Sequence, residues 1–467
     1  MRLAAIFLLI SFAGNVYSQI SESDSVQQNF VIGDISIVGN RTTKRHIILR
    51  ELTFQPGERI SSSTLQKHLI DSKNNLQNTS LFNFITINTL TEGNAINVVI
   101  IVTERWYLWP VVTFELAETN FNSWWENKDF SRINYGLGVR KDNFRGRNEK
   151  LTLNFQFGFT EKISIGYSVP YINKARKLGF SIGFDYGQNH EVNYLSEANK
   201  RLFYKDIDDY MKKNYKGSMS FEYRPRIRAR HGINFEFFHV QIDDTIRSFN
   251  ANYLEEGKTL SEYLAITYRF SKDNRDNKNY ALDGNYFGFA VSQIGLGILN
   301  PDISLLRVGI QYKQFVPLAK RHFLAASGRV MLSPDDFQPY YLQPGLGYSD
   351  KTTIRSYELY VIDGHQWGIG KIQYRFQLIQ PREKEFGFIP VNKFKRVHYA
   401  AYLGWFADVG YSTDNDVIPV NDLANEINYG TGVSLDFVTF YDIVYRTEFS
   451  VNKLGESGIF LHFVAPI

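Results

Sequence analysis

The feature that most constrains this chain is a two-residue alternation of apolar and polar side chains, which recurs from residue 106 to the C-terminus. In one such stretch Leu151, Leu153 and Phe155 point to one side of an extended chain, and the intervening polar residues point to the other. Alternation of this kind indicates strands with one apolar face and one wet face. We expect sixteen strands, at about 109–117, 132–141, 149–158, 161–169, 178–188, 215–225, 231–240, 261–270, 281–294, 302–315, 321–332, 366–377, 397–410, 429–438, 440–450 and 456–464.

Composition places these strands in a membrane. Aromatic residues make up 15% of the chain, while the mean hydropathy is only −0.28. Outside residues 3–13, no apolar run approaches the roughly 18 residues that a membrane helix needs. A sheet in lipid must close on itself, because an open edge leaves backbone groups without partners. We therefore predict a mainly β fold, a 16-stranded antiparallel transmembrane β-barrel at residues 106–467, rather than a water-soluble sandwich.

The N-terminus resembles an export signal. Arg2 supplies a positive charge, residues 3–13 supply a short apolar core, and Ser18 is a small residue before Gln19. The apolar run is too short for a membrane anchor. We expect residues 1–18 to be a signal peptide, followed by a polar linker at residues 19–29.

Residues 30–105 have a different pattern from the rest of the chain. An alternating strand is expected at 31–38, amphipathic helices at 43–52 and near 65–76, and a hairpin of strands at 82–90 and 96–103. This order predicts one small α+β domain in front of the barrel.

One long connection carries an unusual polar motif. Connections between the expected strands mostly alternate between short and long, and residues 334–365 form a long connection that is the sixth on the outer side. It contains Ile354, Arg355, Ser356 and Tyr357. An arginine inside a barrel must be paired, because an unpaired buried charge is costly. The alternative is that Arg355 is a solvated loop residue.

A later strand offers the partner for this arginine. Phe406, Asp408 and Gly410 form an F-x-D-x-G pattern with all three residues on one strand face. With Ile354 to Tyr357, this pattern resembles the BamA/TamA family of outer-membrane β-barrels, of the bacterial surface antigen type. The resemblance implies that the sixth outer loop folds into the barrel and that Arg355 reaches Asp408. Ser356 stands where the family usually has glycine.

The same resemblance assigns roles to both ends of the chain. Residues 30–105 resemble a POTRA domain, the periplasmic module of the family, and the chain has one such domain. The last strand resembles the β-signal by which barrels of this kind are recognised for assembly, carried by Gly458, Leu461 and Phe463.

The first and last strands should form a weak seam. A closed barrel pairs residues 109–117 with residues 456–464, and the first strand carries Trp109, Pro110, Val111 and Thr113. Proline has no N–H to donate, and glycine lowers strand propensity in the last strand. In the family this seam is a lateral gate for client strands. The alternative is that these residues only mark strand ends.

The resemblance implies protein insertion and assembly in the outer membrane, or protein translocation. The sequence contains no H-E-x-x-H, P-loop or G-x-S-x-G motif, so we expect no enzymatic activity. The implied partners are a lipopolysaccharide-containing bilayer, unfolded outer-membrane or exported client proteins, and periplasmic chaperones or accessory proteins. A passive outer-membrane pore or surface antigen with the same fold is the alternative. The net charge of +4 does not indicate nucleic-acid binding, and the absence of cysteine excludes a disulfide or thiolate. The nine histidines lack metal-ligand spacing, so neither a metal nor a cofactor is expected.

Two further clusters have polar side chains at expected turns. Asp273, Arg275 and Asp276 form a D-x-R-D-N pattern, which we interpret as a hydrogen-bonded structural turn. The arginines at 224, 226, 228 and 230 favour a solvated turn over a role in the lumen or at lipid headgroups. The connection at 379–396 is long and basic, and its function is not predicted.

Overall fold

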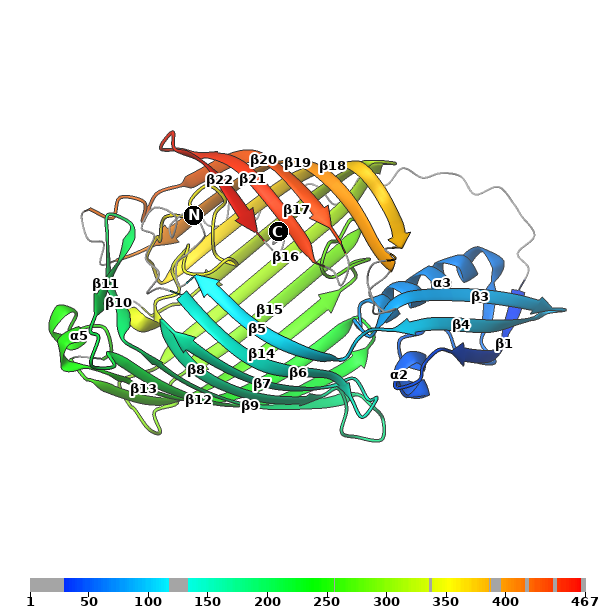
Figure 1. The fold of residues 1–467 in the computed structure, drawn as a ribbon, viewed down its shortest axis with the longest axis horizontal. Coiled ribbons are helices and arrows are strands. Elements are labelled where there is room, and N and C mark those ends of the chain that lie inside the picture. Colours follow the sequence, from blue (N-terminus) through cyan, green and yellow to red (C-terminus); the bar gives the residue numbers. More distant parts are fainter. Residues whose placement is uncertain are drawn as a thin grey trace.

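A computed structural model describes residues 29–116, 133–255, 257–335, 338–385, 387, 396–415, 420–439 and 443–462. Within these residues the chain forms a small α+β domain and a large barrel sheet, which lie end to end along the longest dimension of the molecule (Figure 1). The expected signal peptide, residues 1–18, lies outside the described residues, and so does the expected linker except for its last residue, Asn29. None of the described helices is long and apolar enough to span a membrane.

The small domain is a four-stranded sheet covered by two helices. Its sheet order is β2-β1-β4-β3, and β1 and β4 run parallel. The helix expected at 43–52 is shorter, and a short strand, β2, was not expected. The elements are β1 (Asn29–Val38), α2 (Arg45–Leu49), β2 (Arg59–Ser61), α3 (Ser62–Gln77), β3 (Phe82–Glu92) and β4 (Ala95–Glu104).

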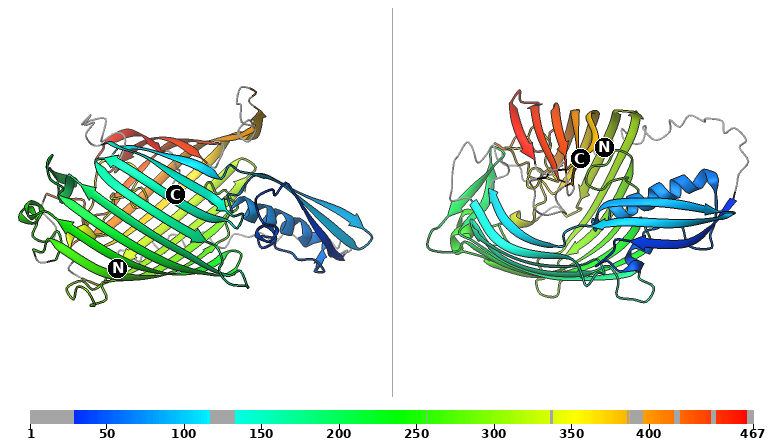
Figure 2. Two further views of the ribbon diagram at one scale, coloured as in Figure 1. Left: turned by 60° about the horizontal axis from the view of Figure 1, so that its bottom comes forward. Right: turned by 45° about the vertical axis from the view of Figure 1, so that its right-hand side comes forward.

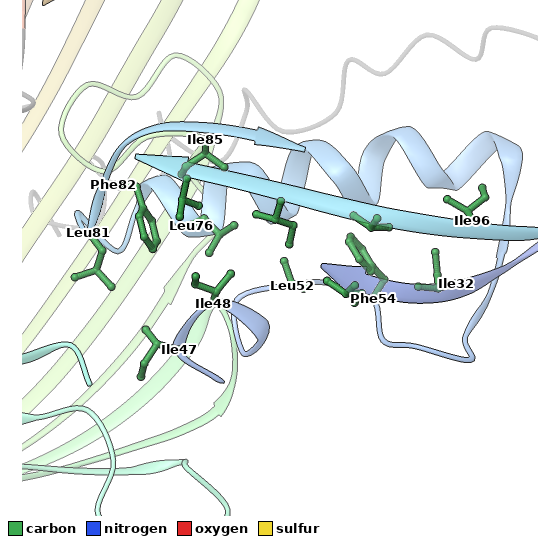
Figure 3. Close-up of a cluster of buried hydrophobic side chains, with 14 of the residues drawn as sticks. Ile32, Ile47, Ile48, Leu52, Phe54, Leu76, Leu81, Phe82, Ile85 and Ile96 are labelled. Carbon is green, nitrogen blue, oxygen red and sulfur yellow. The ribbon is translucent and has the colours of Figure 1, made fainter. Parts of the chain in front are cut away.

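The core of this domain follows from its patterns of apolar residues. Alternate residues of β4 (Ile96, Val98 and Ile100) point inward and are at most 2% exposed. They pack against Ile48 of α2 and Leu76 of α3, in the cluster drawn in Figure 3. The domain therefore has an apolar core of its own, as a folding unit requires.

The barrel sheet contains the predicted sixteen antiparallel strands. The fold class is confirmed, and most strand ends lie within a few residues of those expected. The strands are β5 (Leu108–Leu116), β6 (Ile133–Phe144), β7 (Glu149–Gly158), β8 (Thr160–Val169), β9 (Leu178–Asn189), β12 (Lys212–Arg226), β13 (Ala229–Ile242), β14 (Leu260–Asp273), β15 (Gly284–Ile294), β16 (Leu305–Ala319), β17 (His322–Leu332), β18 (Gln366–Glu385), β19 (Arg396–Thr413), β20 (Asn428–Val438), β21 (Val444–Asn452) and β22 (Ser457–His462).

The two faces of the sheet differ as the alternation predicted. Leu153, Phe155 and Ile165 expose large apolar side chains on the outer face. The inner face is polar, and Gln373 and Ser450 are fully buried there. An apolar exterior around a polar interior is the arrangement of a barrel in lipid.

The sheet does not close between its first and last strands. Every strand pairs with its sequence neighbours in the sheet, but β5 and β22 share no ladder among the described residues. They form the two edges of the curled sheet (Figure 2). The expected pairing of residues 109–117 with 456–464 is therefore wrong for this part of the chain. Pro110 lacks an N–H, and Gly458 lowers the strand propensity of β22, so both edges are poor partners.

Several connections have structure that the sequence did not predict. The long loop after β9 contains the hairpin of β10 (Glu191–Glu197) and β11 (Lys200–Lys205), and the next outer loop contains α5 (Asp244–Phe249). In the connection expected at 379–396, residues 379–385 and 396 belong to strands, because β18 and β19 remain paired as far as Glu385 and Arg396. A short 3₁₀ helix, η3 (Tyr340–Leu342), lies in the sixth outer loop.

Candidate functional site in the barrel lumen

The sixth outer loop, which we take as residues 333–365, turns back on itself and packs inside the barrel. The amides of Leu346 and Ile362 each donate to the carbonyl of the other, at 2.8 and 2.9 Å. Ile354 and Tyr357 are at most 2% exposed and share an apolar cluster with Trp367 of β18. The loop therefore has a small core of its own that holds its polar tip in place.

Arg355 and Asp408 make a buried two-point contact. The Nη2 of Arg355 donates to Oδ1 of Asp408 at 2.6 Å, and its Nε donates to Oδ2 at 2.9 Å. The backbone N–H of Arg355 also donates to Oδ2, at 3.1 Å. Both side chains are at most 5% exposed, and Lys371 lies 3.6 Å from the same carboxylate. The carboxylate thus has a paired charge and three hydrogen bonds, which offset its desolvation.

The other two residues of the F-x-D-x-G pattern also contact the loop. The ring of Phe406 lies under the Arg355 guanidinium, 3.9 Å from centroid to Cζ, in a cation–π contact. A Cβ on Gly410 would lie 2.3 Å from Cδ1 of Ile354, so only glycine leaves room for that side chain. Each residue of the pattern therefore has a physical reason to stand at its position.

Ser356 keeps the turn that the family usually makes with glycine. Its φ is 76°, in the left-handed region that disfavours residues with a Cβ. Its hydroxyl donates to the carbonyl of Arg355. Gly430 of β20 faces this hydroxyl, because a Cβ there would overlap Oγ of Ser356. The tight turn is thus retained at the cost of local backbone strain.

The arginine pair belongs to a larger charged network that the sequence analysis missed. Gln373 of β18 is fully buried, and its Oε1 accepts from Arg446 at 3.3 Å. Arg446 makes a second bidentate pair with Asp436, at 2.6 and 2.7 Å. Glu448 lies two residues further along β21 and is 1% exposed. Such residues can be recognised in the sequence because a polar side chain recurs at every second position of a strand.

The predicted seam and β-signal residues lie on the two free edges. Trp109, Pro110, Val111 and Thr113 are all on β5 and are paired with β6. Gly458 and Leu461 are on β22, opposite Ser450 and Thr447 of β21. Leu461 is exposed on the outer face, as expected for lipid contact. Phe463, the third β-signal residue, lies outside the described residues.

The arginine cluster at the β12–β13 turn is not a solvated turn. Arg224 donates from both terminal nitrogens to the carboxylate of Glu51 in the small domain, at 2.6 Å each. Arg228 donates to Asp71 of α3 at 2.9 Å. The prediction failed because the partners are 173 and 157 residues away in sequence. These contacts hold the small domain against the barrel end.

The D-x-R-D-N turn is hydrogen-bonded internally and also contacts the small domain. Arg275 makes a bidentate pair with Asp273 at 2.8 Å, so the turn is hydrogen-bonded as predicted. Asn78, just after α3, donates to the carbonyl of Asp276 at 3.2 Å and accepts from the amide of Lys278. This turn therefore contributes to the same docking surface.

Electrostatics favour a charged Glu51 in this docking surface. Burial alone would raise the pKa of the Glu51 carboxyl, but the hydrogen bonds and charge of Arg224, together with Arg50, outweigh it. The pKa of Glu51 is therefore held below its ordinary value of 4.5. The ion pair should persist at neutral pH and weaken in acid.

Comparison with known proteins identifies the family. A model described as the Omp85 superfamily domain matches residues 143–439, well over half of the chain. The chain belongs to the Omp85 superfamily. A second model, described as POTRA, surface antigen variable number repeat, matches residues 30–105 of this Omp85 protein. The resemblance to the BamA/TamA family is confirmed at this level, and with it an outer-membrane type of barrel.

Three solved structures are similar to this Omp85 protein at low sequence identity, and the first of them shares its fold. BamA from Haemophilus ducreyi, lacking POTRA domains 1–3, has 14% identity and a TM-score of 0.50, with 93% of this chain and 83% of that chain covered. CdiB from Acinetobacter baumannii has 11% identity and a TM-score of 0.47, covering 93% and 74%. CdiB from Escherichia coli has 9% identity and a TM-score of 0.48, covering 98% and 97%. No curated protein matches the chain by sequence.

Proposed function

We propose that this Omp85 protein inserts unfolded polypeptides into the outer membrane, or passes them across it, through the open edges of its barrel. The observation that carries the proposal is that β5 and β22 form no ladder with each other in the described residues. Unpaired strand edges offer backbone N–H and C=O groups, which an incoming strand satisfies by β-augmentation. A passive pore has no need of such edges.

The position of the sixth loop inside the lumen also supports this proposal. The sixth loop and its ion pairs occupy the interior next to β18, β19 and β21. These paired charges connect the loop to the barrel wall and occupy space that a wide aqueous channel would need. Client strands then pair with the edges of the barrel, and the loop keeps the adjacent strands in register.

The proposal places each part of the chain in a compartment. Residues 1–18 direct export, and residues 19–29 link to a POTRA domain at residues 30–105 in the periplasm. Residues 106–467 span a lipopolysaccharide-containing outer membrane. The partners are unfolded outer-membrane or exported proteins, delivered by periplasmic chaperones or accessory proteins. The proposal includes no enzymatic reaction.

A disulfide across the edges tests the proposal. Thr113→Cys and Phe460→Cys place two lumen-facing thiols on β5 and β22 in a chain that has no native cysteine. If the edges admit client strands, oxidation should abolish client assembly, and reduction should restore it. A matched control joins strands that are already paired: Leu435→Cys with Thr447→Cys across β20 and β21, which are direct partners. Client assembly that continues in the oxidised Thr113–Phe460 variant refutes the proposal and favours a passive pore or surface antigen.

A further inference from the structure

Three side chains from distant segments converge beside the arginine network. Glu358 comes from the sixth loop, Glu448 from β21 and His462 from β22. Nε2 of His462 lies 3.4 Å from Oε2 of Glu448 and 3.6 Å from Oε1 of Glu358. One possible ligand atom from each side chain lies within 4.8 Å of the other two. The last strand, its neighbour and the loop therefore meet at a single point.

These distances fit an ion pair but are too long for a direct charge-assisted hydrogen bond. A charge-assisted N–H···O bond is about 2.7–2.9 Å long, shorter than either distance from His462. Among the described residues, Nε2 of His462 and both carboxylate oxygens of Glu448 make no hydrogen bond. Glu448 is nevertheless 1% exposed. A buried carboxylate without hydrogen bonds is costly unless another ligand satisfies it.

The same distances fit the edges of a coordination tetrahedron. Zinc binds imidazole nitrogen and carboxylate oxygen at about 2.0–2.2 Å, so its tetrahedral ligands lie about 3.3–3.5 Å apart. A cavity of about 10 Å³ lies among the three side chains. That volume holds about one water-sized sphere. An ion at its centre therefore has both the ligands and the space it needs.

The charge of the surroundings also favours a cation. Arg355 and Arg446 each have a bidentate carboxylate partner, in Asp408 and Asp436. Nη1 of each arginine approaches Oε1 of Glu448, at 3.7 and 3.4 Å, and both arginines also contact Oε1 of Gln373. Oε2 of Glu448 faces His462.

The two acids of the cluster, Glu358 and Glu448, share the cavity with Lys371, which also lies 3.6 Å from the carboxylate of Asp408. The charge of this lysine is therefore divided among three acids.

We propose that Glu358, Glu448 and His462 bind a divalent transition metal, with Zn²⁺ the best fit and water as the fourth ligand. Imidazole with carboxylate suits zinc, whereas calcium and magnesium prefer oxygen ligands alone. The ion joins the sixth loop to the last strand, next to the free edge of the sheet. The site does not depend on the proposed function, because binding is measured without any client.

Metal binding to the full-length protein tests the site. The protein is purified without a polyhistidine tag, stripped with a chelator and titrated with ZnSO₄ by calorimetry. We expect one equivalent to bind, and roughly tenfold or greater loss of affinity in both His462→Gln and Glu448→Gln. The matched control is His239→Gln, because His239 contacts a single carboxylate, Glu262, at 2.7 Å. This control should bind zinc as the wild type does.

A second measurement avoids dependence on the variants. Cobalt(II) added to the wild-type protein should give the intense visible absorption of a tetrahedral site, and zinc should displace it. Heat-modifiable migration on gels verifies that each variant is folded. The proposal is overturned if the wild type binds no zinc, if His462→Gln binds it with unchanged affinity, or if cobalt shows only the weak absorption of octahedral coordination. In the first case the cluster is a network of ion pairs alone.

Discussion

Removal of the Arg355 guanidinium should release the sixth loop from the barrel wall. In Arg355→Ala, Asp408 loses hydrogen bonds of 2.6 and 2.9 Å and retains the backbone N–H and Lys371 at 3.6 Å. Breaking one side of a buried pair costs about 3–5 kcal/mol. The residual contacts place this case near the lower end, at about 3 kcal/mol. That energy corresponds to a roughly 150-fold increase in the opening equilibrium of the loop.

Hydrogen exchange measures this opening directly. The amides of Leu346 and Ile362 bond to each other's carbonyls within the loop, so their exchange rates report its opening. Both rates should rise about 100-fold or more in Arg355→Ala. The matched control is Arg329→Ala, which removes a 3.4 Å bond to the carbonyl of Lys351 in the same loop and a cation–π contact with Trp367 at 5.8 Å. Its effect should be below about 1 kcal/mol. Equal effects of the two variants, or a rise of less than about tenfold in Arg355→Ala, would refute the reasoning.

Three other changes have expected outcomes. Gly410→Ala should loosen the loop by about 1–3 kcal/mol, because the new Cβ overlaps Ile354; the same amide exchange measures it, and an unchanged rate would contradict it. Ser356→Gly should slow exchange by the equivalent of about 1 kcal/mol, since glycine adopts the φ of 76° without strain; faster exchange would show that the hydroxyl matters more. Docking of the small domain should weaken as the pH falls below 4.5, because the pKa of Glu51 is depressed in the docked state and its stabilising contribution is present only above that range. Spin-label distances between the domain and the barrel measure docking, and Arg224→Ala should remove this pH dependence.

The strands of the barrel could be predicted because burial on one face imposes a period of two on the sequence. The hairpin of β10 and β11 could not, because its turn is made by Ala198 and Asn199, both with positive φ. Asn-Gly and Asp-Gly are the usual signals for such a turn, and Ala-Asn is not. Tertiary contacts stabilise it instead, since the amide of Val361 donates to the carbonyl of Asn199.

The candidate site was predictable only where a motif marked it. Arg355 and Asp408 were found by pattern and lie in contact in the structure. Glu358, Glu448 and His462 have no common spacing, and only the fold brings them together. The role of Arg224 and Arg228 was predicted wrongly for the same reason. A turn rich in arginine does not indicate which distant acids it will contact.

The two free edges of the barrel have separate mechanical anchors. At one edge, Tyr107 immediately precedes β5, and its hydroxyl contacts Thr43 and the carbonyl of Leu81 in the POTRA domain. At the other edge, the loop that carries Arg355 is fixed to the strands leading to β22. A tilt of the POTRA domain would therefore displace the edge at β5, while the contacts of the sixth loop would hold the edge at β22 in place. Under the function proposed above, the domain would act as a lever through which a bound client widens the gap.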